Sequence, residues 1–165
     1  MDGLKLIIEK ISQYGFFTNI LPGTILCIAL RYVVDYNLFV FGEWYLMGIV
    51  FYFVGIINNR FGSICVDYIL KKLHIITFAP YKDYVIAEQK DAKITILSTE
   101  NNVFRSYISV CLLILLSLLF KMIANNCSFI ENNKSIIIIT LLLILFVLSY
   151  RKQANYVTKR IDATK

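Results

Sequence analysis

The sequence predicts an all-α membrane protein with four transmembrane helices, an N-terminal amphipathic in-plane helix and a mainly helical cytoplasmic middle segment. The first observation behind this class is composition, because the chain is 58% hydrophobic and has a mean hydropathy of +0.67, whereas soluble domains are usually about 45–50% apolar. The second is the presence of four apolar stretches. The third is an uneven distribution of basic residues along the chain.

The apolar stretches form two predicted hairpins, residues 17–57 and 107–150. Each stretch is near the lower limit of the roughly 17–25 residues that a spanning helix needs. Residues 112–120 and 136–148 are nevertheless almost unbroken Leu, Ile and Phe runs without a charge. Continuous rather than alternating runs favour helices over a β-barrel. We expect short outer loops at 35–43 and 124–134.

Basic residues predict the orientation of these spans. If both termini and the middle segment are cytoplasmic, that side holds 14 of the 17 Lys and Arg residues, and only Arg31, Lys121 and Lys134 lie outside. The positive-inside rule therefore predicts a multi-pass protein with both termini in the cytoplasm.

Residues 1–16 are predicted to form an amphipathic helix that lies in the membrane interface. Leu4, Ile7, Ile8 and Ile11 follow the spacing of one helical face. One interpretation is an in-plane anchor, and the alternative is an oligomerisation or gating collar.

A stripe of small or polar residues marks the first span, at steps of four: Asn19, Gly23, Cys27 and Arg31. Such residues let membrane helices approach closely or hydrogen-bond across an interface, so we expect the stripe at a pore or a subunit interface. Pro22 adds a place for a bend. Arg31 has a second interpretation, in which it reaches the outer headgroups or pairs with Asp35.

The second span carries Gly48 and Gly55 on one face, with Tyr52 between them. A helix-packing seam and a ligand-binding role are both compatible with this spacing, and the seam is favoured.

The cytoplasmic segment, residues 58–106, is predicted to contain a helix over 61–73, a break through Ala79, and a helix that Pro80 opens and that ends near Asp91. A short stretch over 93–97 either covers an apolar surface or forms a strand. A final helix capped by Ser98 or Thr99 leads into the third span.

No catalytic or metal-binding pattern occurs in the sequence. The single His and four scattered Cys residues have no metal-ligand or nucleophile spacing. We therefore predict no enzyme activity, no metal and no cofactor.

Basic residues beside aromatic ones form a candidate site for an anionic ligand or lipid, and the last of them open the basic cytoplasmic tail, residues 151–165. A nucleotide or single-stranded nucleic acid would bind by charge and stacking, while membrane lipid would satisfy the same rim. The candidate residues are Arg60, Lys71, Lys72, Lys82, Arg105, Arg151 and Lys152.

The layout resembles the small four-helix membrane proteins that are encoded beside soluble partners in bacterial anti-phage systems, of the Hailong membrane effector or Kiwa membrane component type. The resemblance lies in the Phe-Thr-Asn-Ile-Leu-Pro-Gly run at 17–23, the Phe-Ala-Pro-Tyr-Lys-Asp run at 78–83, and Asn101 with Asn102 before the third span. It implies a homo-oligomer, for which we expect a tetramer, in the bacterial inner membrane, with a soluble protein encoded nearby as its partner.

Two functions follow from this resemblance. The first is a channel-forming effector that a nucleotide, nucleic-acid or protein signal controls through the basic cytoplasmic face. The second is a non-conducting sensor or scaffold that recruits a soluble defence partner.

Overall fold

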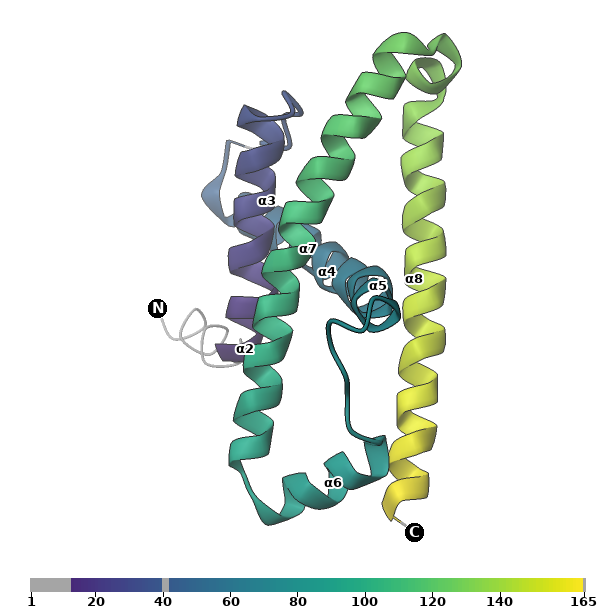
Figure 1. Cartoon of the computed structure of the whole chain (residues 1–165). Coiled ribbons are helices and arrows are strands. Elements are labelled where there is room, and N and C mark those ends of the chain that lie inside the picture. Colours follow the sequence, from purple (N-terminus) through teal and green to yellow (C-terminus); the bar gives the residue numbers. More distant parts are fainter. Residues whose placement is uncertain (1–12, 40–41, 165) are drawn as a thin grey trace.

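The computed structural model describes residues 13–39 and 42–164, and each regular element in these ranges is a helix (Figure 1). The expected amphipathic helix falls almost entirely on residues 1–12, which lie outside the described residues.

The first helix is continuous but changes its winding. It comprises α2 (Gln13–Gly15), the π-helix η1 (Phe16–Ile20) and α3 (Leu21–Tyr32). The chain leaves the helix through Asp35, whose φ of 60° lies in the left-handed region. Aspartate tolerates this region better than most residues.

The second helix extends well beyond the second apolar stretch. It comprises α4 (Trp44–Phe61), the π-helix η2 (Gly62–Val66) and α5 (Asp67–Lys72). The continuation helix predicted for 61–73 is therefore confirmed. In Figure 1 this helix passes behind α7 toward α8, and it contacts α3, α7 and α8.

A linker leads from α5 to α6 (Tyr81–Lys90). The helix α6 crosses from the lower part of α8 to the start of α7 (Figure 1). Pro80 is the N-cap, one residue before the first helical position. The predicted helix is confirmed to within one residue at each end.

The long helix α7 (Lys93–Asn126) begins earlier than the sequence predicts. Neither a strand at 94–96 nor a cap at Ser98 or Thr99 is present, because the Asp91 carboxylate accepts the Lys93 backbone N–H at 2.9 Å. Thr95 then donates a hydrogen bond to Glu88 on α6, at 3.3 Å. This hydrogen bond at the start of the helix and the contact with α6 outweigh the weak helix propensity of the Ile-Thr-Ile run.

The predicted outer loop at 124–134 is wrong, since α8 (Ser128–Thr164) begins only one residue after Cys127, the C-cap of α7. Polar side chains here bond within the helices instead of forming a loop. Asn126 and Asn133 donate to carbonyls four residues earlier, and Lys134 pairs with Glu131 at 2.6 Å.

Among residues 13–39 and 42–164, three helices are long and apolar enough to cross a membrane: 44–72, 93–126 and 128–163. The helix over 16–32 is apolar but shorter, with a rise of about 25 Å against a hydrocarbon thickness of ~30 Å. The coarse prediction of a helical membrane protein is thus supported, with three of the four expected spans meeting the length criterion.

Packing within the chain centres on α3, α4 and α7, while α8 is mostly uncovered. Only 6% of the most apolar stretch of α8 is buried. One of its contacts is Phe146 on Phe53 of α4, with ring centroids 6.3 Å apart. Exposed apolar faces of this kind are typical of helices surrounded by lipid or by other membrane helices.

Candidate functional site: a polar junction and the cavity beside it

The small-residue stripe of the first helix packs on the chain's own second helix. A Cβ atom on Gly23 would overlap the Phe51 carbonyl oxygen, and one on Gly55 would overlap the backbone of Asn19. Cys27 is fully buried. In the described structure the predicted stripe therefore serves close packing inside one chain, and Gly55 belongs to the helix-packing seam that the sequence favours.

Gly48 is not part of that seam, because a Cβ atom there would meet nothing within 4 Å. Arg31 is also exposed, with its guanidinium carbon 4.9 Å from the centroid of the Phe39 ring. Of the alternatives for Arg31, pairing with Asp35 does not occur in the described structure, and reach to the outer headgroups stays a prediction. The Asp35 carboxylate accepts from Lys121 of α7 at 2.7 Å, because the left-handed turn takes Asp35 off the helix.

A cluster of polar side chains joins the helices near the ends that lie closer to α6; we call it the polar junction. Its members are Thr18, Asn19, Asn58, Asn59, Ser63, Asp67, Arg105, Ser106, Ser109 and Lys152.

Four uncharged members of the polar junction are fully buried and bond to backbone groups: Thr18, Asn58, Ser106 and Ser109. Pro22 has no N–H to offer the Thr18 carbonyl four residues earlier, and Ser106 of α7 donates to that carbonyl at 2.8 Å. Ser109 donates to the Asn58 carbonyl at 2.8 Å, and the Asn58 amide donates to the Ser106 carbonyl at 3.1 Å. These bonds tie η1, α4 and α7 together.

The charged half contains two cations and one carboxylate. Arg105 donates to Asp67 at 3.2 Å and to the side chain of Asn59 at 3.1 Å. Lys152 of α8 lies 3.5 Å from the same Asp67 oxygen and donates to both oxygens of Ser63. The side chains of Arg105, Lys152 and Asp67 are only 17%, 29% and 11% exposed. This group therefore holds one more positive than negative charge in a largely buried place.

Lys152 lies two residues beyond the end of the predicted second hairpin, residues 107–150. Desolvation lowers the pKa of its ammonium group, and the nearby Arg105 and Lys71 cations act in the same direction, while Asp67 opposes them. The direction of the net shift agrees with an excess of positive charge at this point.

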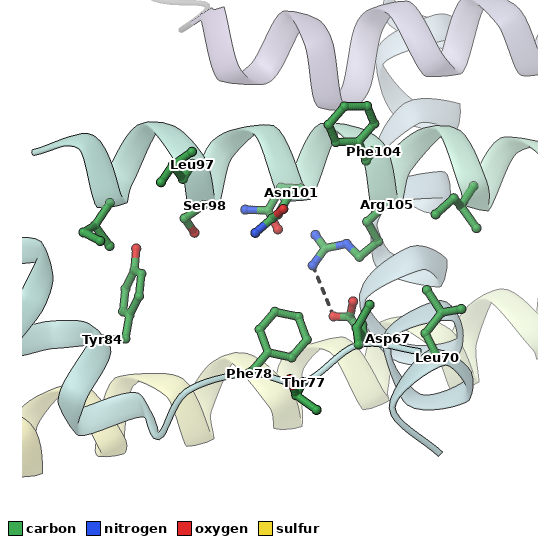
Figure 2. Close-up of a pocket in the computed structure, with 14 residues that line it drawn as sticks. Asp67, Leu70, Thr77, Phe78, Tyr84, Leu97, Ser98, Asn101, Phe104 and Arg105 are labelled. Carbon is green, nitrogen blue, oxygen red and sulfur yellow. Dashed lines mark hydrogen bonds and ion pairs between the residues drawn. The ribbon is translucent and has the colours of Figure 1, made fainter. Parts of the chain in front are cut away.

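A cavity of about 480 Å³ opens beside Arg105 and Asp67, between α5, the linker, α6 and α7. Figure 2 shows Arg105 reaching from α7 toward Asp67, with Phe78 and Tyr84 on the opposite side of the space. One part of the wall is apolar. The other follows polar side chains along α7: Ser98, Asn101, Asn102 and Arg105.

The far side of the cavity is held by contacts between α6 and α8. Arg160 donates to Glu88 at 2.9 Å, and the Tyr81 ring lies 5.9 Å from that of Tyr156. Val85 of α6 is 1% exposed. These contacts fix the position of α6.

Of the seven basic residues predicted to bind an anionic ligand or lipid, the structure brings Arg105 and Lys152 together. Lys71 lies over the ring of Phe78, with its nitrogen 4.4 Å from the centroid. The remaining ones are exposed at separate positions: Arg60, Lys72, Lys82 and Arg151.

Of the junction members, sequence reasoning singled out Asn19, Arg105 and Lys152, and it missed the other uncharged members and the role of Asp67. The signal was present as the polar pairs at the ends of spans, Asn58 with Asn59 and Arg105 with Ser106. The sequence did not indicate which polar residues contact each other, because the hydrogen-bonded partners are about 40 to 90 positions apart.

Within the described ranges, no group of three or more His, Cys, Asp or Glu residues could hold a metal ion. Comparisons with protein-family models, with curated proteins and with solved structures find no match.

Proposed function

We propose that the protein is a non-enzymatic, multi-pass membrane sensor or scaffold of a bacterial anti-phage system, and that it recruits a soluble partner through its α6 end. The observation that carries this choice is the burial of the Gly23 and Cys27 stripe against the chain's own helices. A pore between subunits would need that stripe at a subunit surface. The resemblance of the sequence layout to anti-phage membrane proteins supports the proposed biological setting.

The proposed orientation puts the α6 end in the cytoplasm of a bacterial cell, with both termini on that side of the inner membrane. The charge count supports it. So does the pairing at the opposite end, where Lys121 and Lys134 are neutralised by Asp35 and Glu131. The excess positive charge is thus left at the α6 end.

The α6 end also offers apolar side chains for a partner. Leu73, Ile75 and Phe78 of the linker are 61%, 65% and 57% exposed, next to Lys71 and Lys72. An apolar centre with a basic rim suits a soluble protein with an acidic surface.

A channel-forming homo-oligomeric effector is the second candidate. The nearly uncovered α8 favours it, because an apolar helix whose most apolar stretch is only 6% buried can pack on further copies of the chain.

Ion flux separates the two functions. Purified protein in liposomes should conduct no ions with or without nucleotides, and it should form a stable complex with the soluble protein encoded beside it. Flux that appears or stops on addition of a nucleotide or oligonucleotide would favour the channel and contradict the scaffold.

A further inference from the structure

We propose that the cavity beside Arg105 binds the headgroup of an inner-leaflet phospholipid, with the phosphate diester at Arg105 and a hydroxyl-bearing headgroup along Asn101 and Asn102. The inference rests on membrane insertion, as in the proposed function, but not on partner recruitment.

Charge balance is the first argument. Arg105, Lys152 and Asp67 together carry one unmatched positive charge in a place that is mostly shielded from water. An unpaired charge of this kind is costly, and one phosphate diester has the single negative charge that would balance it.

Unused hydrogen-bond donors are the second argument. A guanidinium has five N–H donors, and Arg105 directs only two toward acceptors in the described part of the chain, Asp67 and Asn59. Its Nε is also without a partner but is buried, so the donors open to a ligand are the remaining N–H groups of the two terminal nitrogens. Phosphate oxygens are the acceptors that match the geometry of an arginine fork.

Position relative to the bilayer is the third argument. Arg105 lies just before the predicted third span and Lys152 just after the fourth, so both are at the boundary of the hydrocarbon layer. The cavity wall runs along α7 from Ile108, inside that span, to Ile94 outside it. Acyl chains can therefore remain in the membrane beside Ile108 while the headgroup enters the cavity.

The polar wall along α7 determines which headgroup fits the cavity. Asn101, Asn102 and Ser98 line the cavity, and their side chains have no hydrogen-bond partner among the described residues. Glycerol hydroxyls can exchange hydrogen bonds with these groups, whereas a choline headgroup has no hydrogen-bond donor. A phosphatidylglycerol-type lipid thus fits both the charge and the polar wall.

The test uses the full-length chain in a neutral detergent, with lipid binding measured by native mass spectrometry. We expect one phosphatidylglycerol per chain, bound at least about tenfold more tightly than phosphatidylcholine with the same acyl chains. Equal binding of the two lipids would overturn the proposal. Because no partner protein is present, the result is independent of whether the chain acts as a scaffold.

Two charge variants separate the cavity from the basic rim. R105Q should weaken phosphatidylglycerol binding about tenfold, the scale of one charge-assisted hydrogen-bonded contact. R151Q removes the same charge from an exposed neighbour of Lys152 and should change the affinity less than about twofold. Equal losses in both variants would assign binding to the rim and refute the cavity site.

A third variant keeps the ion cluster intact. N101L should retain the helical content of the wild type and bind phosphatidylglycerol several-fold more weakly, since it removes only an exposed amide. Unchanged affinity for phosphatidylglycerol in N101L would overturn the headgroup assignment. This test remains valid even if R105Q fails to fold.

A soluble competitor identifies the source of the phosphate. Glycerol phosphate at millimolar concentration should leave the bound lipid in place, because it lacks the acyl chains. Displacement of the lipid at that concentration would show that the site serves a free phosphate ester and would contradict the lipid assignment.

Discussion

At the level of single residues, the close approach of the first two helices depends on two glycines. Gly23 and Gly55 face each other's helix so closely that any Cβ atom would overlap backbone atoms. Backbone atoms in helices cannot move aside as a flexible side chain can. The helices would have to separate, and the hydrogen bond between Asn59 and Asn19, 3.0 Å long, would lengthen with them.

Replacement of Gly55 by alanine should therefore destabilise the protein, by about 1–3 kcal/mol, the usual range for overpacking a tight contact. Thermal unfolding in detergent would measure this change. Gly48 on the same helix provides the matched control, because a Cβ atom there meets nothing within 4 Å. G48A should be neutral or slightly stabilising through its better helix propensity. Equal transition temperatures for G55A and G48A would contradict the close packing.

At the level of elements, α6 owes its place to α8 rather than to its own sequence pattern. Val85 is the buried residue of this helix, and the Glu88–Arg160 ion pair and the Tyr81–Tyr156 contact add to it. The hydrogen bond from Arg160 is the largest cause that lowers the pKa of Glu88 below its ordinary value. Attachment of α6 should thus depend on pH.

The sign follows from the direction of that shift. A carboxylate with a lowered folded-state pKa stabilises the structure fully above its unfolded-state value, and this contribution is lost as the pH falls through the lowered value. Hydrogen exchange of α6 amides, corrected for intrinsic rates, should therefore be slow near neutral pH and faster in acid. The change should be small, since the pair is partly exposed. E88Q should remove the difference, and an equal acid response in E88Q would exclude Glu88 as its origin.

At the level of the whole molecule, the two ends differ in charge balance. At the end with the α7–α8 turn, Lys121 and Lys134 pair with Asp35 and Glu131, whereas the α6 end leaves positive charge unmatched. This asymmetry is the physical basis for the proposed orientation, because segments rich in Lys and Arg tend to remain on the cytoplasmic side of the membrane.

Cysteine labelling tests that orientation in intact cells. In a cysteine-free variant, N132C near the α7–α8 turn should react with a membrane-impermeant maleimide. K82C on α6 should react only after the cells are permeabilised, since both positions are exposed and differ only in the side of the membrane they face. Labelling of K82C in intact cells, with N132C protected, would invert the orientation and remove the cytoplasmic partner from the proposal.

Composition and apolar runs were sufficient to predict a helical membrane chain and the approximate helix positions, because burial in lipid requires long apolar runs in the sequence itself. The charge pattern also gave Arg105 and Lys152 as candidate site residues. The partners of polar residues were not predictable in this way. Asp67 meets Arg105 and Lys152 across 38 and 85 positions, and Gly23 packs against Gly55 of the same chain. Such contacts depend on how the helices cross in space, and the spacing of residues along one helix carries no information about which neighbouring helix its polar face will meet.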